Sequence, residues 1–210
     1  MIHNLKALSL ALAVAFAMSA MVVSAAFAAS FTAPSATTTI TANQTIPHIM
    51  TVTGVGITCT TVSFHGVSGG TNVSSVTIKP TYTGCTTDTL GLTMKITGFG
   101  HYGEEKTCHY VLHASGTVDL VCQAGAEVRR TWGTCSDRIP AQKGLGAITY
   151  ENGASDINAS INITNISGTH TDGFGCPYAS SGSFNNGTMS GLSTVHGSSE
   201  GKTVAIAWDK

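Results

Sequence analysis

The sequence predicts an all-β fold, an antiparallel β-sandwich or an irregular barrel of about ten to thirteen short strands. Two observations lead to this prediction. Apolar and polar side chains alternate with a period of two through most of the chain after residue 28, which is typical of strands with one buried and one wet face. Glycine-containing turns separate these runs, and no window of about ten residues there shows helical periodicity.

The N-terminal segment predicts export. A short basic start precedes an apolar run rich in alanine and leucine, and Ala26 and Ala28 fit the small-residue pattern of a signal-peptidase site. We therefore expect a signal peptide at 1–28 and a single extracellular all-β domain at 29–210. An uncleaved anchor is the alternative, but alanine is weakly hydrophobic. The expected location is secreted or cell-surface, with no stable membrane span after cleavage.

The charge balance argues against nucleic acid as a partner. Only 10% of the residues are charged and the formal net charge is −1, whereas phosphate binding needs clustered lysine and arginine. No pattern indicates a cofactor. Carbohydrate and cell-envelope components stay open as partners.

Five runs are the clearest of the expected strands outside the cysteine hairpin described below. The first is a threonine-rich entry, either a short tail or a first edge strand, and the other four turn their apolar residues to one face. The runs are FTAPSATTTITANQT (31–45), SSVTIKPTY (74–82), LTMKIT (92–97), DINASINIT (156–164) and TVAIAW (203–208). Between such runs, Asn152-Gly153 and Asn186-Gly187 suit tight hairpins, because glycine accepts positive φ.

The stretch CHYVLHASGTVDLVC (108–122) predicts a stapled hairpin. Folding it about its Ala-Ser-Gly midpoint places Cys108 opposite Cys122 on an apolar face, where a disulfide would contribute roughly 3 kcal/mol. His109 and His113 then point outward beside Asp119, which raises the alternative of a metal site. Residues four apart on a strand are separated by about 13 Å, so we favour the hairpin without a metal.

Six cysteines follow the predicted cleavage site, an even number that implies disulfides in an oxidising compartment. No CxxC pair supports a redox or zinc-ribbon interpretation. Besides the pair in the hairpin, the spacing predicts that Cys59 bonds Cys85 across a second hairpin. Cys135 and Cys176 are then left to join more distant segments.

Two patterns resemble catalytic motifs without the context that catalysis needs. GVSGG (66–70) places Ser68 at the nucleophile position of an esterase elbow, but a strand follows it instead of a helix. His65 precedes this serine by only three residues. In HYGEEKTCH, adjacent carboxylates in a loop are more often solvated than catalytic. The candidate acid/base residues of that stretch are His101, Glu104, Glu105 and His109.

Exposed aromatic rings would make a sugar-binding platform, and the best surface candidates are Trp132, Tyr102 and Tyr178. Packing in the core or in loops is nevertheless the favoured role for each. Asn-x-Ser/Thr triplets matter only in a glycosylating pathway. They begin at Asn43, Asn72, Asn158, Asn162, Asn165 and Asn186.

Several phrases in this order resemble a group of uncharacterised exported proteins of soil actinobacteria. They are TTTITANQT, ITCTTVSFHG, KPTYTGC, CHYVLHASGTVDLVC, IPAQKGLGAITYENG and DINASINITNISGT. The resemblance covers most of the chain after the signal segment. It implies export, a β-rich fold and paired cysteines, and it implies no catalytic residue.

The sequence thus predicts an exported, disulfide-stabilised module that binds or displays and has no catalytic site. The first alternative is a secreted hydrolase, acting on polysaccharide, with a site built from loops. The second is a self-assembling surface or filament subunit, in which the threonine-rich N-terminal segment adds to the sheet edge of a neighbour.

Overall fold

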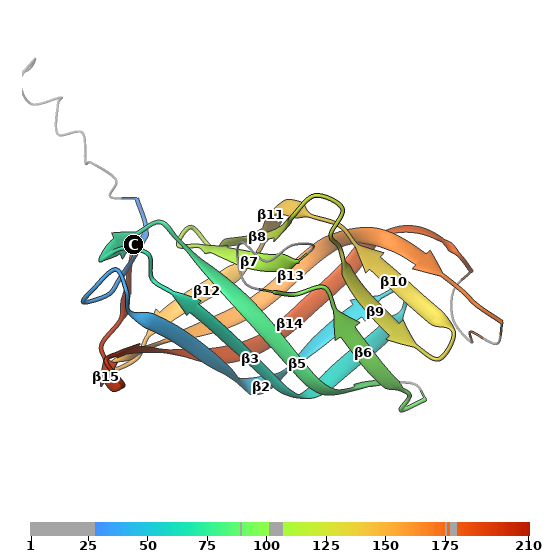
Figure 1. The fold of residues 1–210 in the computed structure, drawn as a ribbon, viewed down its shortest axis with the longest axis horizontal. Helices are drawn as coiled ribbons and strands as arrows, with labels where there is room; N and C mark the ends of the chain where they lie inside the picture. Colours follow the sequence, from blue (N-terminus) through green and yellow to red (C-terminus); the bar gives the residue numbers. More distant parts are fainter. Residues whose placement is uncertain (1–27, 89, 101–106, 175, 177–179) are drawn as a thin grey trace, which may run out of the picture.

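The chain folds into strands joined mostly by short turns, and no helix occurs among the residues that the structure describes (Figure 1). This computed structural model describes residues 28–88, 90–100, 107–174, 176 and 180–210. Almost all of the expected signal peptide lies outside the described residues. The strands are β1 (Ser30–Thr32), β2 (Thr39–Val52), β3 (Val55–Val67), β4 (Asn72–Val73), β5 (Ser75–Thr87), β6 (Thr93–Thr97), β7 (Cys108–His113), β8 (Thr117–Cys122), β9 (Val128–Trp132), β10 (Cys135–Ile139), β11 (Gln142–Gly146), β12 (Ile148–Asn152), β13 (Asp156–Thr171), β14 (Gly182–Ser199), β15 (Lys202–Val204) and β16 (Ala207–Asp209).

Eight of these strands close into an antiparallel barrel. Their order around the wall is β5, β3, β2, β14, β13, β10, β9 and β6, and β6 pairs back onto β5, with Met94 opposite Cys85. The predicted all-β antiparallel class is confirmed. Of the two architectures expected, the barrel forms and the sandwich does not, because the pairing of β5 with β6 joins edges that a sandwich would leave open.

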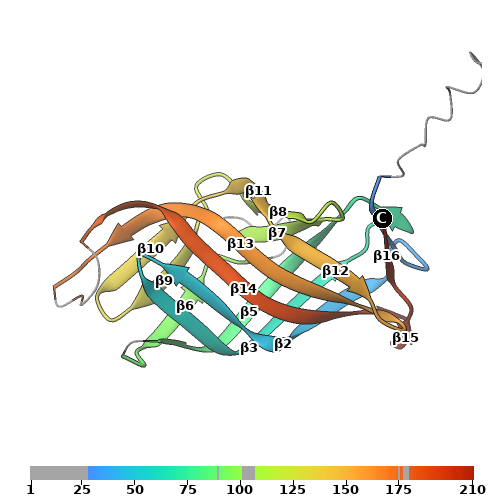
Figure 2. The ribbon, with the colours of Figure 1, turned by 180° about the vertical axis from the view of Figure 1, so that it is seen from behind.

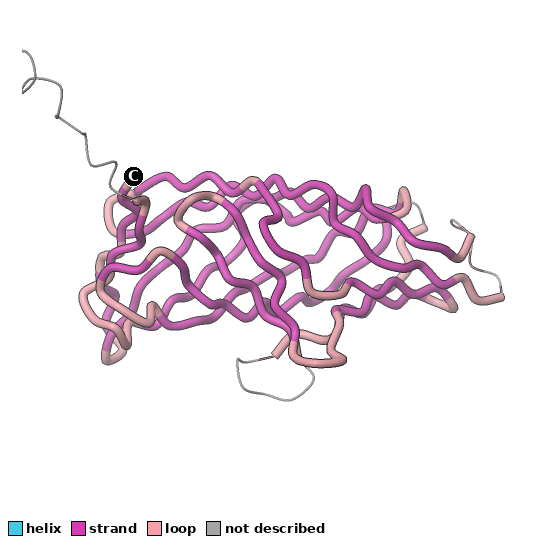
Figure 3. The backbone as a smooth tube through the Cα atoms, turned by 90° about the horizontal axis from the view of Figure 1, so that it is seen from above, coloured by secondary structure: helices cyan, strands magenta, loops and turns pink. Residues whose placement is uncertain are grey.

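The wall is completed by different strands at its two ends. The C-terminal parts of β5 and β13 pair with β6 and β10, whereas their N-terminal parts pair with β7 and β12. β7 pairs with β8, and β8 pairs with β11. Only Ala147 separates β11 from β12, so strands surround the interior at this end as well (Figure 2). We call the end with β7, β8, β11 and β12 the apolar end, and the end with β6, β9 and β10 the network end. The result is an elongated tube (Figure 3).

The period-two alternation places the core inside this tube. Val76, Ile78 and Pro80 of β5 are buried as predicted, as are Ile157 and Ile163 of β13. Five long strands, β2, β3, β5, β13 and β14, run through both ends and carry most of this apolar face inward. Burial of that continuous face is the main force that holds the barrel together.

A small sheet of β16, β1 and β4 covers the apolar end. Phe31 of β1 lies opposite Trp208 of β16 and packs edge-on against Tyr150, with ring centroids 5.0 Å apart. Trp208 Nε1 donates a hydrogen bond to the Ala114 carbonyl at 2.9 Å. The TVAIAW run is therefore divided between β15 and β16 instead of forming one strand.

The threonine-rich entry is neither a tail nor an edge strand. Beyond β1 it forms the start of β2, which pairs with β3 on one side and β14 on the other within the same chain. For example, Thr41 lies opposite both His65 and His196. A segment already paired on both sides cannot add to a neighbouring molecule without opening the barrel, so strand donation by this segment has no structural basis.

Each disulfide joins a pair of cysteines that the sequence analysis proposed, and together the three bonds indicate an oxidising environment. Two join directly opposite residues of paired strands, with Cα atoms 3.8 and 4.0 Å apart, and the third spans 5.4 Å. They are Cys59–Cys85, Cys108–Cys122 and Cys135–Cys176. The register of the hairpin β7–β8 also matches the prediction, with Tyr110 opposite Leu120.

One predicted turn is wrong. Asn186-Gly187 lies inside β14, where Gly187 pairs with Ile166 of β13. A Cβ atom at Gly187 would lie 2.9 Å from the Ile166 carbonyl oxygen, so glycine is needed here for close strand approach and not for a turn. The described residues also contain 16 strands, more than expected, because several are very short.

Candidate functional site

A polar groove of about 670 Å³ lies on the outside of the wall between β11 and β13. Its position follows from the fold, since β12 pairs with β13 whereas the preceding strand β11 pairs with β8, so a gap opens between β11 and β13. The polar side chains along it are amides, hydroxyls and one amine. They belong to Gln142, Lys143, Asn162, Thr164, Asn165 and Ser167. We call this feature the β11–β13 groove.

The strand β13 is irregular along the groove. On the side facing β11, it pairs with β12 as far as Ile161, bonds to Ala147 at Asn162 and pairs with β10 from Thr169, and the described residues provide no strand partner in between. Its register against β14 shifts twice over the same stretch, on both sides of Ile166. Asn165 adopts a φ of 61°, which is uncommon for a residue other than glycine. Bulges and unusual backbone of this kind concentrate at binding sites.

At Ser167, the side chain of Gln142 makes the hydrogen bonds that a neighbouring strand would otherwise make to β13. Its amide Nε2 donates to the Ser167 carbonyl at 3.0 Å, and its Oε1 accepts from the Ser167 N–H at 2.8 Å. This two-point contact satisfies the backbone at Ser167. Asn162, Thr164 and Asn165 are exposed, so their polar atoms face solvent in the groove.

Beneath the groove, Leu145 separates its polar surface from the barrel interior. Leu145 and Gln142 line the groove on one side and a small apolar cavity of about 20 Å³ on the other. Leu120 and Ile163 line the same cavity from inside. The groove therefore has a polar rim over a closed, apolar floor.

The charge near the groove is low. Lys143 is the one charged residue among the described residues that line it. Behind it, Asp119 accepts the Gly144 N–H at 2.7 Å and lies 3.2 Å from His113 Nε2. Burial alone would raise the pKa of Asp119, but the bonds from Gly144 and His113 outweigh it and the pKa lies below its usual range. The carboxylate thus holds the β11 backbone in place.

The alternative metal site is only partly assembled. His113 and Asp119 meet, but His109 is 3% exposed and lies away from them, and burial lowers its pKa. The expectation that His109 points to solvent is therefore wrong. No group of three metal-ligating side chains occurs among the residues that the structure describes.

Other sequence candidates do not form a site. Trp132, a surface candidate for which core packing was the favoured role, is 1% exposed, because it lies on the inward face of β9. Ser68 is buried and its Oγ donates to the Ser35 carbonyl at 2.8 Å, which is a loop-anchoring bond, while His65 is exposed on β3. Tyr102, Tyr178, His101, Glu104 and Glu105 lie outside the described residues.

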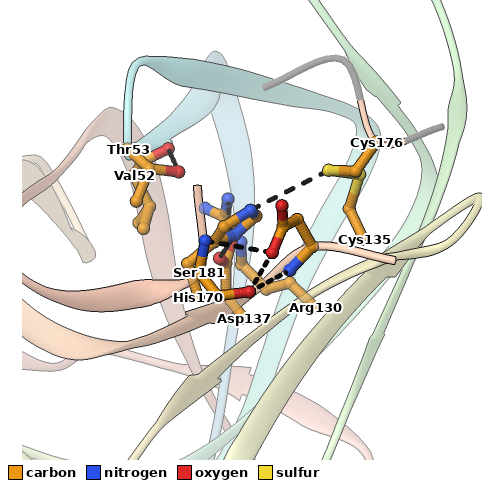
Figure 4. A network of polar contacts seen from close by, with 9 residues as sticks. Val52, Thr53, Arg130, Cys135, Asp137, His170, Cys176 and Ser181 are labelled. Atoms are coloured by element: carbon orange, nitrogen blue, oxygen red, sulfur yellow. Dashed lines mark hydrogen bonds and ion pairs between the residues drawn. A yellow bond between two sulfur atoms is a disulfide. The ribbon is translucent and has the colours of Figure 1, made fainter. Parts of the chain in front are cut away.

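A second polar cluster, which the sequence analysis missed, lies inside the network end (Figure 4). Arg130, Asp137 and His170 face one another across β9, β10 and β13, and none of the three side chains is exposed. Asp137 contacts Arg130 Nη2 and His170 Nδ1, each at 2.7 Å. Burial lowers the pKa of Arg130 to about 10, although the Asp137 carboxylate opposes that shift.

The signal for this cluster is present in the sequence. Trp132 and Cys135 flank a two-residue turn, and that hairpin places Arg130 directly opposite Asp137. Both residues share the inward face with Val128, Trp132 and Ile139. Charged residues in phase with apolar ones on both strands of a hairpin indicate a buried ion pair.

Midway along the interior, His48 Nε2 lies 2.9 Å from Ser193 Oγ, and both residues are buried. Burial lowers the pKa of His48 to about 4, so this histidine is neutral near pH 7. Apolar cavities nearby have volumes of about 40 Å³. That space is far below the roughly 300–1,000 Å³ of a typical ligand site, so the interior is a packed core and not a binding lumen.

Comparison of the chain with protein-family models, with curated proteins and with solved structures finds no match. Among the described residues, no helix has the length and apolar character needed to cross a membrane. The β11–β13 groove is therefore assessed from its own geometry and chemistry.

Proposed function

We propose that this protein is an exported binding module that holds a neutral polysaccharide chain in the β11–β13 groove. The observation that carries the proposal is the groove itself, about 670 Å³ in volume and lined by amide and hydroxyl side chains. Its volume falls within the roughly 300–1,000 Å³ of ligand sites. Export follows the signal peptide proposed at 1–28.

The chemistry of the groove favours sugar over other polymers. Asparagine and glutamine side chains both donate and accept hydrogen bonds, and threonine and serine hydroxyls do the same, so they complement sugar hydroxyls. A single lysine cannot neutralise a polyphosphate chain. The backbone of β13 beside Thr164 and Asn165 offers further donors and acceptors along the same line.

The rigidity of the groove supports binding without large rearrangement. Its two walls belong to the barrel, and the contacts from Gln142 to Ser167 and from Asp119 to Gly144 hold them in place. Side chains on such a frame lose little conformational freedom when a ligand binds.

The test is binding to a panel of insoluble polysaccharides, with calorimetry on soluble oligosaccharides from any that retain the protein. Asn162→Ala and Thr164→Val each remove one polar group from the groove, and we expect each to weaken binding about 5- to 30-fold, since a lost hydrogen bond costs about 1–2 kcal/mol. Asn185→Ala on β14 is the matched control, because Asn185 is exposed but does not line the groove.

The folded state of each variant is checked by its thermal unfolding midpoint. Binding that is unchanged in Asn162→Ala and Thr164→Val, or that is lost equally in Asn185→Ala, would contradict the proposal. So would a panel on which the wild-type protein retains no polysaccharide.

A further inference from the structure

The third disulfide has a histidine beside one of its sulfurs (Figure 4). Cys176 Sγ lies 3.9 Å from His170 Nε2, and the other ring nitrogen of His170 contacts Asp137 Oδ1 at 2.7 Å. Sulfur, imidazole and carboxylate thus stand in the order found where a base activates a thiol. This arrangement is independent of the β11–β13 groove.

The buried charges determine which nitrogen of His170 carries a proton. The guanidinium of Arg130 forms an ion pair with the Asp137 carboxylate, with Nη2 and Oδ2 2.7 Å apart. An ionised carboxylate only accepts hydrogen bonds, so His170 Nδ1 is the donor to it. In the neutral imidazole, Nε2 therefore has its lone pair directed to the sulfur side. It can take a proton there while Asp137 balances the charge.

The other two disulfides have no such group beside them within the described part of the chain. Cys59 and Cys85 are 4% and 3% exposed and are held in a regular ladder between β3 and β5. Cys108 is fully buried opposite Cys122. Among the described residues, no hydrogen bond joins a titratable side chain to any of these four sulfurs. Cys176 is half-buried and lies between β13 and β14 outside regular strand pairing.

We propose that Cys135–Cys176 is a redox-active disulfide that exchanges with an external protein dithiol, with His170 as the proton acceptor beside Cys176 and Asp137 as the residue that positions His170. One thiolate of the dithiol attacks Cys176 Sγ, the S–S bond breaks, and Cys135 leaves and is protonated. The second thiol of the dithiol then attacks its partner sulfur in the mixed disulfide and releases Cys176. The dithiol is oxidised to a disulfide, and Cys135–Cys176 is reduced by the same two electrons.

His170 acts in the second step. The two protons that the dithiol loses are the two that the protein gains, one on Cys135 and one on His170 Nε2. The released Cys176 is then a thiolate beside an imidazolium, and Asp137 stabilises that cation across 2.7 Å. A stabilised thiolate is a better leaving group, so Cys176 is released from the mixed disulfide faster than a cysteine without such a neighbour, and complete reduction of this bond should be the fastest of the three.

The first experiment uses the wild-type protein in its native state. It is exposed to a limiting amount of a small dithiol at pH 7, free thiols are alkylated, and each cysteine is quantified by mass spectrometry. We expect Cys135 and Cys176 to be reduced at least about tenfold faster than the other four cysteines. Equal rates for the three bonds, or faster reduction of either other bond, would overturn the proposal.

The second experiment measures the thiolate directly. Cys135→Ser leaves Cys176 as a free thiol, and Cys108→Ser leaves Cys122, which is also half-buried, as the matched control. Alkylation of Cys176 at pH 7 should be at least about tenfold faster than that of Cys122, with a pH midpoint well below the usual value of about 8.5. A midpoint near that value would contradict the proposal.

Adding His170→Asn to Cys135→Ser separates the proton-accepting role of His170 from a structural one. Asparagine can still donate to Asp137 but has no group at the position of Nε2. We expect alkylation at pH 7 to slow about tenfold while the unfolding midpoint stays within the range set by Cys135→Ser alone. Unchanged alkylation in the double variant would show that His170 does not act on the sulfur.

Discussion

The two ends of the barrel are closed by strands with the same alternating pattern but have different interiors. At the apolar end, Ile40, Val76 and Ile157 are buried with other apolar side chains. At the network end, Arg130 and Asp137 occupy equivalent inward positions with no exposure at all. The period of two therefore determines which residues face inward, whereas the charge of the interior depends on whether each buried charged residue lies opposite a residue of opposite charge.

Asp137→Asn should have the largest effect on stability. The substitution leaves the Arg130 guanidinium buried without its counter-charge, and breaking a buried pair in this way costs about 3–5 kcal/mol. Urea unfolding of the full chain with its disulfides intact measures the loss. A loss below about 1 kcal/mol would mean that the network end does not depend on this ion pair.

Lowering the pH should destabilise the barrel, because the unfolded chain takes up a proton on His48 more readily than the folded one. The pKa of His48 is lowered from 6.5 to about 4 in the folded state, so the unfolded chain binds the proton more tightly. Stability is therefore complete above pH 6.5 and falls as the pH drops toward 4, by about 2 kcal/mol at pH 5 relative to pH 7. His48→Gln should flatten that slope, leaving the smaller slope that His109 contributes in the same direction. An equally steep dependence of stability on pH in His48→Gln would show that His48 is not the cause of the effect.

Ile157→Val should have a modest effect at the apolar end. The residue is 4% exposed, and removal of one methylene from a packed core costs about 0.5–1.5 kcal/mol. Urea unfolding under the same conditions allows direct comparison with Asp137→Asn. If Ile157→Val and Asp137→Asn lowered the free energy of unfolding equally, the network end would not depend on its buried ion pair more than the apolar end depends on its packing.

Replacing the whole network should have the smallest effect. Arg130→Met, Asp137→Leu and His170→Phe together remove every buried charge of the cluster, and such replacements leave the free energy of unfolding within about 1 kcal/mol of the wild type or raise it. A triple variant less stable than Asp137→Asn would show that the charges themselves stabilise the fold.

Much of the barrel could be predicted from local sequence. The hairpin β7–β8 has its turn residues, its apolar face and both cysteines within 15 residues, and its register follows from them. Arg130 opposite Asp137 was also readable across the turn between Trp132 and Cys135. Its signal is weaker than that of the cysteine hairpin, because charged residues in a strand usually face water.

The closure of the barrel and the groove could not be predicted in this way. β5 pairs with two different strands along its length, and no local pattern specifies where one partner replaces the other. The groove depends on the path of β11 away from β13, whose facing residues, such as Gln142 and Ser167, are 25 positions apart. Contacts between residues so far apart in the sequence depend on the complete fold, which no local pattern specifies.

Binding of a neutral polysaccharide in the β11–β13 groove can be measured residue by residue in an NMR titration of the 15N-labelled protein with an oligosaccharide. We expect the largest backbone shifts within 142–147 and 162–167, on both walls of the groove. Shifts confined to other parts of the surface, or no shifts at millimolar sugar for every oligosaccharide of the panel, would contradict it.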